Sequence, residues 1–322
     1  MKTKIDIVSG FLGAGKTTLI NKILTEISGL EKIVIIENEF GEIGVDADIL
    51  EKHGVKIREI NSGCICCTLY GNFVSAMNEL IAQYVPDRIV IEPSGIGKLS
   101  DVIKACQAVV RDKQSKLNML IAVVDSLKYK TYSNNFGDFF EDQIRFAKTI
   151  VLSRTQLADE VLVNEIVKEI RHLNCNANII TKPWNQLNGE EVLRIAEDNR
   201  DELDIKIDEN YFEDHHHHQH NEQEVFDVWS QKTTTKYSKH QIQQILYQLK
   251  DKDTYGAILR GKGIVQTAEG CGIQFDYVSE EINIKEIEYP NMGKIIIIGK
   301  DINKSALKKL FESISCGDLQ QC

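Results

Sequence analysis

The sequence predicts an α/β fold with a mainly parallel sheet, followed by a smaller α+β domain. In residues 1–205, short apolar segments alternate with segments of helical periodicity, as in strand–helix–strand units with right-handed crossovers. Residues 206–224 are polar and aperiodic, which is typical of a linker. In residues 225–322, segments of strand character are mixed with two helical segments, which indicates a small α+β domain.

The expected strands of the first domain are short apolar runs, and residues 32–37 are apolar enough to be buried on both faces. The full set is residues 5–9, 32–37, 55–60, 88–92, 117–125, 149–152 and 178–180. Between them we expect helices that begin near Thr18 and that cover about residues 70–84, 100–108, 139–147 and 159–172. The second domain is expected to hold strands at 225–232, 255–270, 273–278 and 294–299, and helices at 238–250 and 304–313.

A glycine-rich turn follows the first expected strand and fits the pattern GxxxxGKS/T. Such a turn directs several backbone N–H groups inward, and the positive end of the following helix adds to its attraction for a phosphate chain. Lys16 is expected to reach the outer phosphates, and the Thr17 hydroxyl to hold Mg²⁺. An ordinary glycine-rich turn would not require the strand, the Lys-Thr pair and the helix in this order. The expected contacts are Gly10, Gly13, Ala14, Gly15, Lys16, Thr17 and Thr18.

Ligands of parallel sheets bind at the carboxyl ends of the strands. The glycine-rich turn, an acidic loop at 38–46, a cysteine loop at 61–68 and Glu92 all follow such ends, so we expect them to share one edge. Glu92-Pro93-Ser94-Gly95 occupies the place of a second acidic motif beside magnesium, where an Asp is usual. The alternative for Glu92 is a strand-end carboxylate that faces water.

Gly63-Cys64-Ile65-Cys66-Cys67 places three of the eight cysteines within four positions. In a regular strand Cys66 and Cys67 would point to opposite faces, so joint ligation requires a loop. Thiolates suit zinc or copper(I), with cobalt(II) tolerated, and three thiols leave a fourth position for exchange. The alternative is that they are small buried hydrophobic residues, a role that we expect instead for Cys106 and Cys175.

A histidine run lies in the expected linker, where five of the eight histidines fall within six positions. These are His215, His216, His217, His218 and His220. Neutral imidazoles bind zinc, nickel or copper, and a weak, exchangeable site here would gather metal. The alternative is a solvated linker.

Composition narrows the classes of partner. A net charge of −10 argues against nucleic acid, because that interface needs a cationic surface. The longest apolar run, residues 294–299, is too short to span a bilayer, and residues 1–10 do not read as a secretory segment. We therefore expect a cytoplasmic protein with neither nucleic-acid nor membrane partners.

Together these motifs resemble the CobW-like family of P-loop GTPases, relatives of the hydrogenase- and urease-maturation GTPases. The resemblance covers nearly the whole chain, including Glu37-Asn38-Glu39-Phe40-Gly41-Glu42 as a switch-like segment and a C-terminal CobW-type domain around 294–299. It implies GTP-dependent delivery of a transition metal, Zn²⁺ or else Co²⁺, to a client metalloprotein or cofactor-assembly enzyme. It also implies catalysis by Lys16, Thr17 and Glu92 with GTP/GDP and Mg²⁺, in a monomer or homodimer. Glu37 and Glu42 are candidates for further metal ligands.

The chain departs from that family where the base is read. In place of Asn-Lys-x-Asp it has Ser153-Arg154-Thr155-Gln156. A Gln156 side chain offers guanine one neutral acceptor, losing charge-assisted bonds worth roughly 1.5–3 kcal/mol each. Its amide also matches the donor–acceptor pair of adenine, and Arg154 can lie on the base. The resemblance implies GTP, whereas Gln156 indicates a relaxed base selectivity; alternatively, backbone groups or Asp159 replace the missing Asp.

Two other functions remain open from the residues. The chain could be a metal store or sensor whose nucleotide site only stabilises the fold. It could instead activate a cofactor enzyme, such as a corrinoid or nitrile-hydratase system. Hydrolysis is expected to be slow without a partner, because no arginine finger stands in these motifs.

Overall fold

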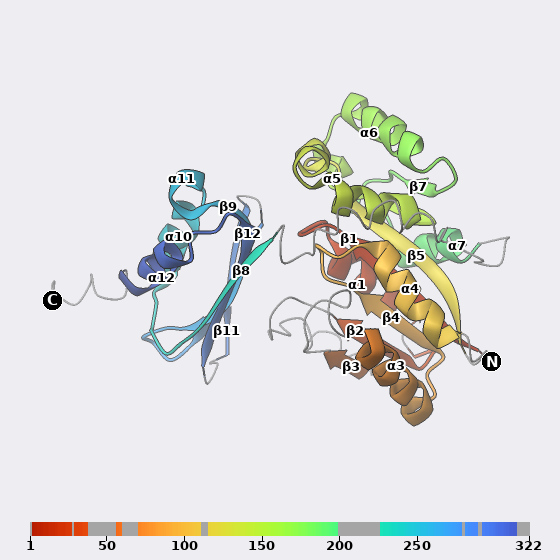
Figure 1. Cartoon of the computed structure of the whole chain (residues 1–322), viewed down its shortest axis with the longest axis horizontal. Coiled ribbons are helices and arrows are strands. Elements are labelled where there is room, and N and C mark those ends of the chain that lie inside the picture. Colours follow the sequence, from red (N-terminus) through yellow and green to blue (C-terminus); the bar gives the residue numbers. More distant parts are fainter. Residues whose placement is uncertain are drawn as a thin grey trace. The chain divides into compact units, whose positions relative to one another are not determined.

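The computed structural model describes residues 2–27, 29–37, 56–59, 70–110, 115–198, 226–278, 281–288 and 292–313. The chain divides into two compact units, Met1–His217 and His218–Cys322. Figure 1 shows a sheet with helices in each unit.

Within the described residues, the first unit is built on a seven-stranded sheet in the order β3-β2-β4-β1-β5-β6-β7. Every neighbouring pair is parallel. The strands are β1 (Thr3–Gly10), β2 (Ile33–Glu37), β3 (Lys56–Glu59), β4 (Arg88–Glu92), β5 (Ser115–Asp125), β6 (Thr149–Ser153) and β7 (Asn178–Ile180). Because β1 lies between β4 and β5, the turn that follows it opens at the middle of the carboxyl edge.

Helices cover both faces of this sheet (Figure 1). They are α1 (Lys16–Ile27), α3 (Tyr70–Tyr84), α4 (Leu99–Val110), α5 (Tyr129–Phe146), α6 (Glu160–Leu173) and α7 (Gly189–Glu197). Helices α1 and α7 pack on each other and, with the sheet, bury a shared apolar core. Helices α3 to α6 contact one another in succession. The parallel α/β fold predicted from the sequence is confirmed.

Within the described residues, the second unit has a five-stranded antiparallel sheet in the order β11-β10-β9-β12-β8. Its strands are β8 (Asp227–Thr233), β9 (Ala257–Gln266), β10 (Gly272–Val278), β11 (Glu281–Ile287) and β12 (Gly293–Lys300). Its helices are α10 (Lys239–Gln248), α11 (Lys252–Tyr255) and α12 (Lys304–Ser313). Strand and helix side chains share one core, in which the rings of Trp229 and Phe311 stack at 5.4 Å. The α+β expectation for this part is confirmed.

Four elements differ from the sequence-based expectation, and the short helix α11 is one that was not predicted. Helix α5 begins at Tyr129, whereas the sequence predicted a start near residue 139. The non-helical backbone at Phe136 (φ −139°, ψ 32°) interrupts the helical periodicity, so the first part of the helix was not recognised. Helix α7 was not predicted, although Asn188 caps it by accepting from the Glu191 N–H at 2.9 Å. Strand β11 was not predicted either, because its exposed edge position leaves it with few buried side chains.

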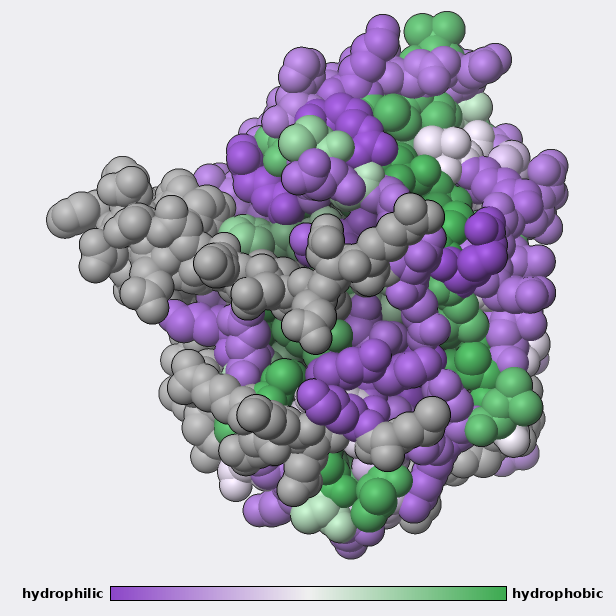
Figure 2. Space-filling model, turned by 90° about the vertical axis from the view of Figure 1, so that its right-hand side faces the viewer, coloured by the Kyte–Doolittle hydropathy of each residue, from purple (hydrophilic) through white to green (hydrophobic). Residues whose placement is uncertain are grey.

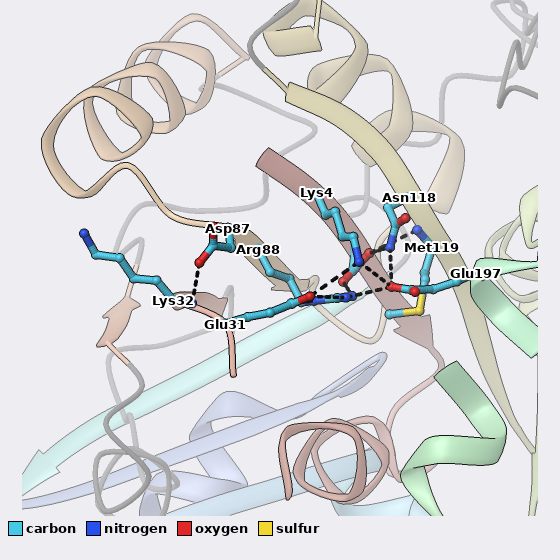
Figure 3. A network of polar contacts seen from close by, with 9 residues as sticks. Lys4, Glu31, Lys32, Asp87, Arg88, Asn118, Met119 and Glu197 are labelled. Atoms are coloured by element: carbon cyan, nitrogen blue, oxygen red, sulfur yellow. Dashed lines mark hydrogen bonds and ion pairs between the residues drawn. The ribbon is translucent and has the colours of Figure 1, made fainter. Parts of the chain in front are cut away.

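A network of buried charges holds the amino-terminal edge of the first sheet (Figure 3). Arg88, at the start of β4, is 1% exposed and pairs with Asp6 of β1, which is fully buried. The same guanidinium bonds Glu31 and, at 2.6 Å, Glu197 at the end of α7. Asn118 of β5 donates to Asp6 at 2.7 Å. Burial raises the pKa of Asp6, although the charge of Arg88 opposes this.

No helix in the described part of the chain is long and apolar enough to cross a membrane. On the face drawn in Figure 2, hydrophilic residues are interspersed with hydrophobic ones.

Candidate functional site

The turn between β1 and α1 has the backbone that its glycines were expected to provide. Gly10, Gly13 and Gly15 have φ angles of 147°, 69° and 104°, in the region that side chains rarely adopt. A Cβ on Gly10 would lie 2.4 Å from the carbonyl oxygen of Val123 in β5. Gly10 is therefore required both by its dihedral angle and by the close approach of the neighbouring strand.

Lys16 begins α1 and folds back over this turn. Its side chain is 5% exposed, and its Nζ donates to the carbonyls of Gly10 at 3.0 Å and Phe11 at 3.4 Å. The ammonium therefore lies at the rim of the turn, where backbone N–H groups and the helix N-terminus also favour an anion. Ala14 is buried and Thr18 is exposed.

Thr17 and Glu92 meet at the same edge. The Thr17 hydroxyl lies 3.0 Å from Oε1 and 3.1 Å from Oε2 of Glu92, which ends β4. Glu92 is 7% exposed, so it is not a strand-end carboxylate that faces water. A hydroxyl and a carboxylate are hard oxygen ligands, and their proximity fits a Mg²⁺ that keeps several waters. Strand order thus brings Lys16, Thr17 and Glu92 together.

Aromatic side chains of α5 pack against the glycine-rich turn. The Phe11 ring lies 4.6 Å from that of Tyr132 and 5.3 Å from that of Phe136, between centroids. The Tyr132 hydroxyl donates to the Leu12 carbonyl at 3.3 Å. The variable positions of the motif therefore anchor the turn to the core.

The same helix holds the loop after Glu92. The buried Gln143 amide donates to the carbonyls of Gly97 at 2.8 Å and Gly95 at 3.3 Å. Asp142 accepts from the Ser100 N–H at 3.0 Å and its hydroxyl at 2.6 Å, at the start of α4. Burial raises the pKa of Asp142 to about 6.

Gly95 brings the two loops into contact. A Cβ on Gly95 would lie 2.9 Å from the Leu12 nitrogen and 2.8 Å from its Cδ2. The sequence did not point to Asp142 or Gln143 as supports of the site. Glu141 and Arg145 stand beside them in the same helix, so no local pattern set these two polar residues apart from solvent-facing ones.

The loop after β6 was expected to meet a base. Arg154 has a left-handed backbone (φ 58°) and forms an ion pair with Asp125, which ends β5. The Ser153 carbonyl accepts from the Ser126 hydroxyl at 2.8 Å. Gln156 Oε1 accepts from the Trp184 backbone N–H at 3.4 Å. These bonds connect the loops that follow β5, β6 and β7 at the carboxyl edge of the sheet.

Asp159 was the alternative source of a carboxylate at this place. Its Oδ1 accepts from the Leu162 N–H at 2.7 Å, so it caps the start of α6. That bond gives the carboxylate a structural role.

The expected transition-metal ligands lie outside the described residues, namely Cys64, Cys66, Cys67, Glu42, His215, His216, His217, His218 and His220; so does the side chain of Glu37. The described part of the chain contains no group of three or more His, Cys, Asp or Glu side chains placed to hold a metal ion. Cys106 is buried, as predicted, and burial raises the pKa of its thiol to about 12. The prediction for Cys175 is wrong: it is exposed, because it lies in the turn between α6 and β7.

Two family models match the chain, one on each side of the polar stretch at 206–224. The CobW/HypB/UreG nucleotide-binding domain matches residues 4–181. The C-terminal domain of the cobalamin synthesis protein cobW matches residues 226–315.

Curated relatives resemble part of the chain. The zinc chaperone YeiR of Escherichia coli strain K12 is 34% identical over 153 residues, 48% of this chain and 47% of YeiR. The zinc chaperone CobW of a Sinorhizobium species is 32% identical over 186 residues, 49% of this chain and 52% of that one. The chain thus spans about half the length of these relatives. Among solved structures, Zn(II)-bound YjiA GTPase from E. coli is 20% identical with a TM-score of 0.48, over 98% of this chain and 99% of that one.

Proposed function

The chain belongs to the CobW/HypB/UreG family, and from that premise we propose that it hydrolyses GTP and uses the reaction to deliver a transition metal to a client protein or cofactor. The observation that carries the proposal is the meeting of Lys16, Thr17 and Glu92 beside the glycine-rich turn. These residues supply a cation, a hydroxyl and a carboxylate where a phosphate chain and Mg²⁺ would be bound.

The residues of this chain divide the work of phosphoryl transfer. Lys16 exchanges its bonds to the Gly10 and Phe11 carbonyls for bonds to the outer phosphates and offsets the charge that develops there. Thr17 and Glu92 would hold Mg²⁺, and the Glu92 carboxylate would orient its water ligands. Bound Mg²⁺ supplies charge neutralisation of the phosphate oxygens. No arginine finger stands in the motifs, so slow turnover without a partner is expected.

The transported metal would be bound by the cysteine motif. Cys64, Cys66 and Cys67 offer three thiolates, which suit Zn²⁺ first and Co²⁺ second. Zinc is favoured because YeiR and CobW are named zinc chaperones. A site with an open fourth position can give its metal to a receiving protein, and the histidine run at His215–His218 and His220 would gather metal weakly.

We further propose that the functional parts are a P-loop GTPase domain at 1–205, a histidine-rich linker at 206–224 and a CobW C-terminal-type α+β domain at 225–322. The site of action is the cytoplasm, with a metalloprotein or cofactor-assembly enzyme as partner and a monomer or homodimer as the working form.

The test measures GTP hydrolysis with Mg²⁺, with and without Zn²⁺ or Co²⁺, in wild type and Cys66→Ala. We expect metal to change turnover or nucleotide affinity in wild type and to have much less effect in the variant. A wild type whose turnover and nucleotide affinity ignore both metals would contradict coupled delivery. Negligible turnover with intact metal binding would favour the store or sensor. A stable complex with a corrinoid or nitrile-hydratase enzyme would favour the activator.

A further inference from the structure

We propose that the base end of this site accepts adenine nucleotides nearly as well as guanine nucleotides, with Gln156 and Trp184 as the specificity-determining residues. This inference rests on the proposed function in one respect, namely that the site binds a nucleoside triphosphate. Beyond that, it specifies the base: the site would bind either purine, because no carboxylate is available to select guanine.

The order of the strands fixes the direction in which a nucleotide lies. Thr17 and Glu92 mark the magnesium and the outer phosphates, and Glu92 belongs to β4, on one side of β1. Strands β5, β6 and β7 lie on the other side of β1. A phosphate chain held by the turn must therefore carry its base toward the ends of β6 and β7, where Gln156 and Trp184 stand.

Trp184 lies next to the phosphate-binding turn. A Cβ on Gly15 would be 3.5 Å from the indole Cζ2 and 3.8 Å from Cη2. The indole is half-buried and packs against the core shared by α1 and α7. An aromatic ring at this place can stack on a base, and stacking tolerates any base because every base has a π-face.

The bond between Gln156 and Trp184 fixes which end of the amide is engaged. A backbone N–H can only donate, so the Gln156 atom that faces Trp184 at 3.4 Å must be the acceptor Oε1. The amide Nε2, a donor, is then the end of the side chain left to meet a base. The guanine edge offers two donors, N1–H and the 2-amino group. The Nε2 group of Gln156 is also a donor, so it cannot accept a hydrogen bond from either of them. Adenine offers an acceptor at N1, which Nε2 can bond.

The nearby acids do not replace the missing carboxylate. Asp125 is 1% exposed, forms an ion pair with Arg154 and accepts from the Leu127 N–H at 2.9 Å. Asp159 caps α6. The charge of Arg154 is balanced by Asp125, so the loop also presents little net charge to the O6 atom of guanine. Neither acid is placed to enforce guanine over adenine.

The experiment uses the two tryptophans of the chain. Trp229→Phe removes the one in the second unit and leaves Trp184 as the reporter. We would titrate this variant with non-hydrolysable GTP, ATP and ITP analogues and Mg²⁺, following tryptophan fluorescence. We expect dissociation constants for ATP and GTP within about tenfold, whereas sites built to hydrogen-bond one group reject analogues by about 10⁴-fold. ITP, which lacks the 2-amino donor, should bind at least as tightly as GTP.

Gln156→Asp supplies the matched variant. It should restore two charged acceptors and shift the preference toward GTP by about 10²-fold. Calorimetric titration of the unmodified chain repeats the comparison in case Trp229→Phe fails to fold. Binding of GTP more than 10²-fold tighter than ATP by the wild type would overturn the inference, and so would an unchanged preference in Gln156→Asp. If neither nucleotide bound, the proposed function itself would fail.

Discussion

The two edges of the first sheet use buried charged residues in opposite ways, and β4 contributes one such residue to each edge, Arg88 and Glu92. At the amino edge, Arg88 of β4 bonds directly to the carboxylates of Asp6, Glu31 and Glu197. At the carboxyl edge, Lys16 donates to backbone carbonyls and Glu92 meets a hydroxyl. Bonds between opposite charges are expensive to break inside a protein, whereas bonds to neutral groups can be exchanged for a phosphate or a cation. The first edge therefore stabilises the fold, and the second is suited to binding.

Substitution of Arg88 is expected to have the largest effect and tests whether the amino edge stabilises the fold. Arg88→Met should lower the free energy of unfolding by about 3–5 kcal/mol, because it leaves the fully buried Asp6 without its cation. Denaturant unfolding measures the loss. Lys130→Met is the control, since the Lys130–Glu165 pair is exposed and should contribute below about 1 kcal/mol. Equal losses in the two variants would mean that the amino edge is not a structural lock.

The opposite result is expected at Lys16. Lys16→Ala should weaken binding of the triphosphate or its turnover by about 10²–10³-fold, because the phosphates lose a preorganised cation. Its effect on unfolding should be small beside that of Arg88→Met. Calorimetric titration and thermal unfolding of the same sample give both values. A variant that unfolds easily but still binds nucleotide would reverse the contrast.

The support of the carboxyl edge by Asp142 should make the stability of the fold depend on pH. Burial raises its pKa from 3.8 to about 6, so the folded chain binds a proton there more tightly than the unfolded chain does. The contribution of Asp142 to stability is therefore largest below pH 4 and falls by up to about 3 kcal/mol as the pH rises through 6. The difference in unfolding free energy between wild type and Asp142→Asn should follow this course. A difference that stays constant from pH 4 to 7 would contradict it.

Gln143 gives the smallest effect. Gln143→Met preserves volume but removes the donor to the Gly95 and Gly97 carbonyls, at a cost of about 1–3 kcal/mol in unfolding free energy. The loop after Glu92 should also become less well placed, so we expect kcat to fall more than KM rises. Gln243→Met, at an exposed position of α10, is the control. A change in KM alone would show that this loop does not position Glu92.

The parts of this site that are local in sequence were predictable, and those made by tertiary contacts were not. The turn at Gly10–Lys16 carries its geometry in its glycines, and the place of Glu92 followed from a short strand ending at one edge. Gln143 and Trp184 reach the site from α5 and from the β7–α7 connection, across tens of residues. No local pattern marks such contacts, because a helix or loop of the same composition would form without them. The interrupted periodicity at Phe136 hid the first half of α5, which carries Tyr132, whereas the half that carries Gln143 was predicted.

That helix has a thermodynamic consequence for the site. One element, α5, touches the nucleotide turn through Tyr132 and the loop after Glu92 through Gln143. Changes made at residues with a shared partner do not add, so Tyr132→Phe and Gln143→Met should show a coupling free energy in a double-mutant cycle. The conformation of the glycine-rich turn and the position of the loop after Glu92 would then be thermodynamically coupled through α5.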